Sequence, residues 1–185
     1  MELFWEKGYS STSVADILSR SQVNSGSLYH FFPGKQDVLL AVLECYRDGI
    51  EAMLLRPAWA GVNDPIERVF ALLSLYRRLI DETECQYGCP IGSLALELHD
   101  ADPIVRERLA ENFSGWVDAI ETCLRSASHR FGGGTDFRAL AELALNVMEG
   151  GVMLARTFRD VAPFDRAVAQ YKAYLDALLV KEAAR

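Results

Sequence analysis

The sequence predicts an all-α protein. Apolar side chains recur three and four residues apart through most of the chain, which is the spacing of one face of an α-helix. Alternating apolar runs joined by Asn-Gly or Asp-Gly turns are absent, so no β-hairpin is expected. Proline and glycine fall between the apolar stripes, where helices begin and end. We expect two helical domains, a smaller one over residues 1–46 and a larger one over residues 47–185.

The composition is that of a globular protein with a sizeable core. Half of the 185 residues are apolar, yet no run approaches the roughly 18 consecutive apolar residues that a membrane-spanning helix needs. The first residues lack the basic leader of a signal peptide, and the four cysteines are not spaced as in a disulfide scaffold. A cytoplasmic protein with reduced thiols and no membrane contact is therefore expected.

The charge of the chain is acidic. The net charge is −7 and the isoelectric point is near 5.0, which argues against indiscriminate binding to polyanions. Residues 1–47 carry four basic and five acidic side chains, so most of the acidic excess lies downstream. A nearly neutral amino-terminal segment permits local contacts with phosphate but does not predict them.

Two short helices joined by a tight turn are predicted near the amino terminus. Gly8 stops a preceding helix, and Ser13 opens one that runs to about residue 20, with Asp16 placed as in a capping box. A turn of about four residues follows, and Asn24 or Ser25 caps the next helix. Such a pair of helices forms a helix-turn-helix. The residues expected in its core are Val14, Ile17, Val23, Leu28 and Phe31.

The second helix of this pair is the candidate for reading DNA. In a helix-turn-helix, the first residues of the second helix enter the major groove. Asn24, Ser25 and Ser27 offer small polar groups there, and Gly26 lets the backbone approach the bases closely. The alternative is a small three-helix packing unit whose aromatic residues all belong to its core.

Further helices follow from the apolar stripes and from the residues that bound them. Pro57 is expected to end the first of these, and Pro65 and Pro103 stand in the first turn of two others. Asp102 is placed to cap one of them, and three glycines from Gly132 end the same long helix. The expected ranges are 35–53, 65–81, 91–99, 103–131, 136–158 and 163 to near the carboxyl terminus.

Short motifs follow one another in a specific order through roughly the first 50 residues. They are Gly8-Tyr9, Thr12-Ser13-Val14, Asp16-Ile17, the run Gly26-Ser27-Leu28-Tyr29-His30-Phe31-Phe32, and Lys35. Together they resemble the DNA-binding signature of the tetracycline-repressor (TetR) family. The resemblance implies phosphate contacts from Thr12, Tyr29 and Lys35, and a basic arm ahead of Met1. The expected DNA-binding residues are Thr12, Ser13, Asn24, Ser25, Gly26, Ser27, Tyr29, His30 and Lys35.

The same resemblance implies a repressor that a small molecule releases from double-stranded operator DNA. In this family the central helices enclose a ligand pocket, and here they carry many bulky apolar side chains, so an apolar, aromatic or electrophilic effector is expected. Its polar anchors would be Glu97, His99, Asn146 or Glu149. The expected pocket residues are Phe70, Tyr76, Cys89, Leu96, Glu97, Phe113, Trp116, Met148, Glu149 and Met153.

Cys89 is a candidate for chemical sensing. The segment from Gly88 to Glu97 resembles the turn and short helix of TetR relatives that respond to drugs and electrophiles. Cys89 stands at the expected helix start, where backbone amides and the helix dipole lower the pKa of a thiol. It is a candidate for reaction with quinones, aldehydes or oxidants, and the alternative is an unreactive thiol that lines the pocket. The spacing of Cys85, Cys89 and His99 is not that of a structural zinc finger, so no metal site is predicted.

The last two helices are candidates for a dimer interface. Specific binding by a helix-turn-helix normally needs two half-sites and a two-fold dimer. Apolar stripes on both helices fit a four-helix interface between two copies, although amphipathic helices can equally face only their own core. The expected interface residues are Leu143, Val147, Gly151, Leu154, Val168, Tyr171, Leu175 and Leu178.

An enzyme is the rival class of function. The chain shows no phosphate-binding glycine loop, no zinc-protease motif and no nucleophile elbow, so neither catalysis nor a cofactor is expected. The acidic net charge leaves one further alternative open, a helical ligand-binding dimer without DNA-binding activity.

Overall fold

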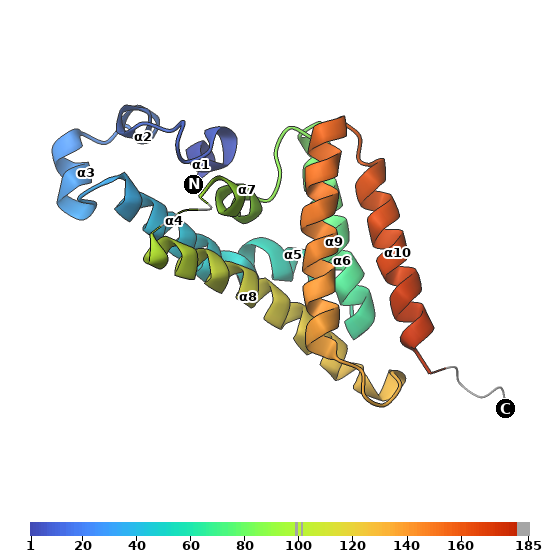
Figure 1. Cartoon of the computed structure of the whole chain (residues 1–185). Helices are drawn as coiled ribbons and strands as arrows, with labels where there is room; N and C mark the ends of the chain where they lie inside the picture. Colours follow the sequence, from blue (N-terminus) through green and yellow to red (C-terminus); the bar gives the residue numbers. More distant parts are fainter. Residues whose placement is uncertain (99, 101, 181–185) are drawn as a thin grey trace. The chain divides into compact units, whose positions relative to one another are not determined.

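The chain is built from helices joined by turns and loops in the part that the computed structural model describes, residues 1–98, 100 and 102–180 (Figure 1). Helices make up 78% of the structure and no strand forms in these ranges, where one isolated antiparallel bridge joins Phe131 to Leu179. The predicted all-α class is therefore confirmed. His99, one of the expected polar anchors, lies outside the described residues. No helix in the described ranges combines the length and apolar character needed to cross a membrane.

Each helix expected from the sequence is present, with ends that differ by a few residues. In chain order the elements are α1 (Glu2–Lys7), α2 (Val14–Ser21), α3 (Ser25–Phe31), α4 (Lys35–Ile50), the π-helical turn η1 (Glu51–Leu55), α5 (Arg56–Trp59), α6 (Pro65–Glu82), α7 (Pro90–Glu97), α8 (Pro103–Ser126), the 3-10 turn η2 (Ser128–Arg130), α9 (Phe137–Phe158) and α10 (Ala162–Leu178).

Aspartate side chains fix where several of these helices begin. Asp64 Oδ1 accepts hydrogen bonds from the amides of Ile66 and Glu67 at 2.8 and 3.0 Å. Asp102 and Asp136 cap α8 and α9 through single bonds of 3.0 Å. Amides in the first turn of a helix have no partner within the helix, so these carboxylates satisfy groups that would otherwise need water. The predicted cap at Asp102 is confirmed.

Pro57 does not end a helix, contrary to the expectation from the sequence. The amide of Arg56 donates to the carbonyl of Glu51, closing a π-helical turn, and α5 then continues to Trp59. Proline is tolerated in the first turn of a helix because its missing N–H would lack a partner there anyway. Because the wider turn of η1 lets a new short helix start at Arg56, Pro57 falls in a first turn rather than in a helix interior.

The described chain folds into two compact units, residues 1–49 with 87–113, and residues 50–86 with 114 onward. In the first unit α7 packs on α1, and polar contacts join α8 to α4. The Asn112 side chain donates to the carbonyl of Leu43 at 3.1 Å, and Arg47 pairs with Glu111 at 2.9 Å. Each compact unit therefore combines two separate stretches of the sequence, whereas each of the two predicted domains is one continuous stretch.

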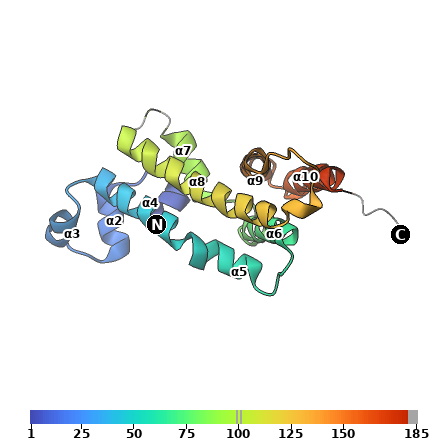
Figure 2. The same cartoon turned by 90° about the horizontal axis from the view of Figure 1, so that it is seen from below.

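The core of the second unit lies between α6, α9 and α10, which run side by side (Figure 1 and Figure 2). The apolar residues that recur at helical spacing in the sequence of α6 are all buried: Val69, Leu72, Leu73, Tyr76 and Ile80. Gly151 of α9 lies directly against Phe164 of α10: a Cβ at Gly151 would stand 2.8 Å from the phenyl ring and 3.2 Å from its Cα. The two helices can approach this closely only where one of them has no side chain.

Candidate nucleic-acid interface

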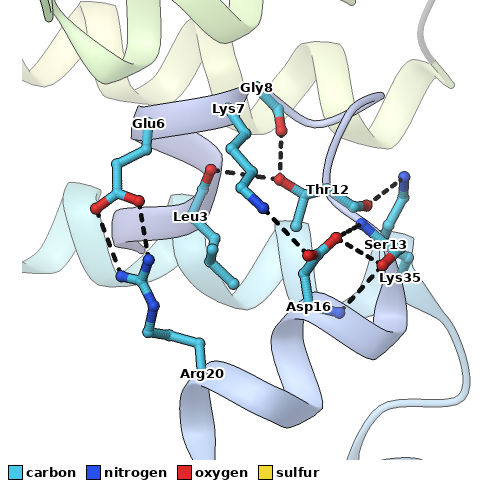
Figure 3. A network of polar contacts seen from close by, with 9 residues as sticks. All are labelled: Leu3, Glu6, Lys7, Gly8, Thr12, Ser13, Asp16, Arg20 and Lys35. Carbon is cyan, nitrogen blue, oxygen red and sulfur yellow. Dashed lines mark hydrogen bonds and ion pairs between the residues drawn. The ribbon is translucent and has the colours of Figure 1, made fainter.

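The second helix of the first unit begins with a complete capping box. Ser13 Oγ accepts a hydrogen bond from the Asp16 amide at 3.0 Å, and Asp16 Oδ2 accepts one from the Ser13 amide at 2.9 Å (Figure 3). Lys7 Nζ adds an ion pair to Asp16 Oδ1 at 3.1 Å. The bonds from Ser13, followed by that from Lys7, hold the pKa of Asp16 well below its ordinary value. The capping box predicted from the sequence is confirmed.

A short turn separates α2 from α3. Gln22 ends α2 in the left-handed conformation, with a φ of 56°. Asn24 Oδ1 then accepts a hydrogen bond from the Ser27 amide at 2.8 Å, so Asn24 rather than Ser25 is the cap of α3. Two short helices, a tight turn and a capped second helix are the elements of a helix-turn-helix, as the sequence predicts.

The surface of α3 is polar at its start and aromatic toward its end. Ser25, Gly26 and His30 are exposed, and Tyr29 is 51% exposed. The ring of Phe31 packs edge-on against that of His30, with centroids 4.9 Å apart. This helix therefore offers donors, acceptors and aromatic surface to a partner.

The expectation that Val23 and Phe31 pack in the core of this motif is wrong. Val23 is 41% exposed and Phe31 is 73% exposed, whereas Leu28 and Phe32 are half-buried. Because α3 has only seven residues, one narrow face can pack inward, and Leu28 occupies it. Phe32, where the chain leaves the helix, is more buried than Phe31.

Thr12 and Lys35 support the turn between α1 and α2 from inside. Thr12 is fully buried, and its hydroxyl donates to the carbonyl of Gly8 at 2.6 Å (Figure 3). Lys35 Nζ donates to the carbonyls of Tyr9 and Thr12 at 2.9 and 3.0 Å and lies over the Tyr9 ring. The phosphate contacts that the family resemblance implies for Thr12 and Lys35 stay predictions, and here both side chains bind the protein's own backbone.

Glu97, at the end of α7, lies against the same turn. Its Oε2 accepts a hydrogen bond from the Tyr9 amide at 2.8 Å, and its Oε1 accepts one from the Ser10 amide at 2.5 Å. Burial opposes ionisation of this carboxyl, but the Ser10 hydroxyl, the Ser10 and Tyr9 amides and the charge of Lys35 together outweigh it and lower its pKa. No sequence signal pointed to this contact, because Ser10 and Tyr9 precede Glu97 by 87 and 88 residues in the chain. The role of Glu97 as an effector anchor stays a prediction.

All four basic residues of the first 47 have partners within the first unit. Besides Lys7 and Lys35, Arg20 pairs with Glu6 at 3.0 Å, as Figure 3 shows, and Arg47 pairs with Glu111. Ion pairs exposed at a surface contribute little to stability, but they occupy these cations in the free protein.

The expected pocket residues are divided between the two units. Those buried in the second unit are Phe70, Tyr76, Trp116 and Met148. Those in the first unit are Cys89, Leu96, Glu97 and Phe113. On α9, Glu149 is half-buried and Met153 is exposed. Cys89 is the N-cap of α7, as expected, and it is buried.

Within the second unit, Trp116 stands out among these residues. Its ring meets that of Tyr76 edge-on, with centroids 6.5 Å apart. Its indole N–H is buried and has no acceptor among the residues that the structure describes. A cleft of about 320 Å³ in the same unit, between the η1–α6 segment and α8, is lined by none of the expected pocket residues. In the described ranges no group of three or more histidine, cysteine or acidic side chains is placed to hold a metal ion.

The expected interface residues of α9 and α10 fall into two groups. Gly151, Tyr171 and Leu175 are buried in the core of their own unit, where the Tyr171 hydroxyl donates to the carbonyl of Leu140 at 3.0 Å. Leu143 and Leu154 are exposed on α9, beside an exposed Phe158. Val147, Val168 and Leu178 are half-buried.

Two family models match the sequence. Residues 1–42 match the model described as bacterial regulatory proteins of the tetR family, and residues 65–170 match that of the LmrA/YxaF-like transcriptional regulator C-terminal domain. The chain is similar to the HTH-type transcriptional regulator Rv0196 of Mycobacterium tuberculosis, with 32% identity over 181 residues, 96% of this chain and 90% of the relative. The HTH-type transcriptional repressor DhaR of Mycobacterium sp. strain GP1 is 26% identical over 167 residues, 89% of this chain and 82% of the relative.

The fold is also that of a solved structure. The regulatory protein TetR from Rhodobacter sphaeroides superimposes with a TM-score of 0.82 at 27% identity, covering 97% of this chain and 94% of that one. Members of the matched families are transcriptional regulators, not enzymes. Since a capped helix-turn-helix, both family models and a relative aligned over nearly its whole length agree, the chain belongs to the TetR family of bacterial transcriptional regulators.

Proposed function

We propose that this regulator is a repressor, that it binds operator DNA as a homodimer in the cytoplasm, and that a small molecule releases it. The observation that carries DNA recognition is the exposed surface of α3, whose start is fixed by Asn24. The name of the relative DhaR, a transcriptional repressor, favours repression over activation.

Recognition divides between the two ends of α3. Ser25 and Gly26 stand exposed in its first turn, where a recognition helix meets base edges in the major groove. Tyr29, one turn further on, offers a ring and a hydroxyl suited to the sugar-phosphate backbone. Contacts of the first kind specify sequence, and those of the second kind position the helix.

The exposed face of α9 supports the homodimer. Leu143, Leu154 and Phe158 are large apolar side chains on one helix, and each is exposed. Val147 and Gly150 lie between them on the same face at helical spacing. A second copy that covers this face would remove the apolar surface from water and supply the second reading helix that an operator of two half-sites requires.

The buried indole N–H of Trp116 supports the effector part of the proposal. A buried donor without an acceptor costs free energy, so a ligand that brings an acceptor oxygen to this position is favoured. Tyr76 and Met148 are buried in the same unit and suit an apolar or aromatic body. Because α4 continues along the chain into η1 and α5 of the second unit, movement there can change the separation of the two reading helices.

The DNA-binding part is tested with a duplex selected from a random pool by the full-length wild-type protein. Tyr29→Ala is expected to lower affinity for that duplex about tenfold, since it removes a ring and a hydroxyl from the contact surface. Fluorescence anisotropy measures the affinity, and circular dichroism checks the fold. Tyr29→Phe keeps the ring and separates its contribution from that of the hydroxyl.

Failure of the wild-type protein to enrich any sequence would favour the alternative, a helical ligand-binding dimer without DNA-binding activity. The effector part has a separate test. A compound that binds the free protein must weaken operator binding by the factor by which operator DNA weakens binding of the compound. A compound that binds tightly and leaves operator affinity unchanged is not an effector.

A further inference from the structure

We propose that Glu97 of α7 is a positioning residue for DNA binding. Its carboxylate holds the turn between α1 and α2, and this turn sets the start of α2 and so the placement of the helix-turn-helix. The proposal rests on the proposed DNA-binding function, and every residue that it invokes lies in the first compact unit. Nothing in it requires Glu97 to touch DNA.

The amide side of the turn is bound by one carboxylate. Oxygens Oε2 and Oε1 of Glu97 each accept a hydrogen bond from one of two successive amides, those of Tyr9 and Ser10. Hydrogen bonds to an ionised acceptor are about twice as strong as neutral ones. Two of them at adjacent peptide groups fix both the position and the orientation of this stretch of backbone.

The carbonyl side of the same turn is bound by one ammonium group. Lys35 Nζ donates to the carbonyls of Tyr9 and Thr12, and Figure 3 shows it beside the Ser13 cap of α2. The turn is thus held between an anion from α7 and a cation from α4. Each of the two charges binds the backbone groups of complementary polarity, and the residue that follows the turn is the cap on which α2 depends.

Gly8 makes room for the carboxylate. Its φ of +79° ends α1 in a conformation that residues with a side chain rarely adopt, and a Cβ there would stand 2.6 Å from Glu97 Oε2. The glycine that the sequence marks as a helix stop therefore also leaves the space that Glu97 fills.

The segment just before α7 is attached to α1. Trp5 Nε1 donates to the carbonyl of Gly88 at 2.7 Å, and the rings of Trp5 and Tyr87 lie 4.9 Å apart. Trp5 of α1 holds the segment just before α7, and Glu97 at the end of α7 holds the turn that follows α1. The helix that carries Glu97 is therefore attached to the rest of the first unit at both of its ends.

The test compares two variants of the full-length protein that lose the same charge. Glu97→Gln keeps one acceptor oxygen but places an NH₂ donor opposite the second amide. We expect the exchange of the Tyr9 and Ser10 amides, followed by NMR, to become about tenfold faster. Affinity for the selected operator duplex is expected to fall about fivefold. Amides in the core of α9 are expected to keep their protection, because they belong to the second unit.

The matched control is Glu107→Gln, since Glu107 is an exposed residue of α8 in the same unit. It is expected to leave both the Tyr9 and Ser10 amides and operator affinity unchanged. Glu97→Asp, which keeps the charge on a shorter side chain, is expected to recover part of the lost affinity. General loss of folding would instead expose amides of both units together.

Two results would overturn the proposal. If Glu97→Gln binds the duplex as tightly as Glu107→Gln, the contact serves the fold alone, and the proposed function still stands. If the wild-type protein selects no duplex at all, the proposed function is wrong, and the role of Glu97 in DNA binding is then wrong as well.

Discussion

Gly151→Leu is expected to lower the free energy of unfolding by about 3 kcal/mol, because it forces a side chain into a packed helix contact. Even a single Cβ at this position would lie 2.8 Å from the ring of Phe164 and 3.2 Å from its Cα. The ring is buried and cannot rotate away into solvent, and the Cα belongs to the backbone of α10. The two helices would have to separate, and chemical denaturation monitored by circular dichroism measures the loss.

The matched control for this substitution is Gly115→Leu in α8. Gly115 is also a helical glycine of the second unit, but a Cβ there meets nothing within 4 Å. Leucine has a higher helix propensity than glycine, so this variant is expected to be unchanged or more stable by up to about 1 kcal/mol. Equal losses in the two variants would show that the α9–α10 contact is not the cause.

Leu154→Asp is expected to reduce operator affinity about 100-fold or more by separating the proposed dimer. Leu154 is 38% exposed on the apolar face of α9, and a carboxylate there would be buried without a partner when two copies associate. A dimer with two recognition helices binds an operator far more tightly than a monomer with one, because the second binding event is intramolecular. Sedimentation at micromolar concentration gives the mass, and anisotropy gives the operator affinity.

Leu79→Asp is the control for this prediction. Leu79 is 40% exposed on α6 of the same unit, so the same substitution is made at nearly equal exposure but on a helix outside the proposed interface. It is expected to change neither the mass nor the operator affinity. A Leu154→Asp protein that keeps the mass of a dimer and full affinity would rule out this face as the interface.

The helix starts could be predicted because their causes lie within a few residues in the sequence. The Ser13–Asp16 capping box and the cap at Asp102 each depend on one side chain and on amides two or three residues away. The π-helical turn before Pro57 is also local, but no residue type marks it, and a proline in a helical stretch more often ends the helix.

The contacts that join distant segments could not be predicted in this way. Glu97 meets Tyr9 and Ser10 only because α7 packs on α1, and the sequence does not state which helices are neighbours. An apolar stripe likewise predicts a helix face but not what covers it. Leu175 and Leu154 were both expected at an interface, yet Leu175 lies in its own core and Leu154 is exposed.

The internal partners of Lys7, Arg20, Lys35 and Arg47 bear on how the operator complex responds to ionic strength. A protein that binds B-DNA releases about 0.9 counterion for each phosphate that it neutralises, and this release makes affinity fall as salt is added. A helix-turn-helix segment whose basic side chains already have partners within the protein releases few counterions when it binds DNA. Its hold on DNA would then depend on hydrogen bonds and ring contacts from α3, which added salt weakens little. Nonspecific attachment to DNA depends on phosphate charge, so discrimination between the operator and bulk chromosome should widen as ionic strength rises.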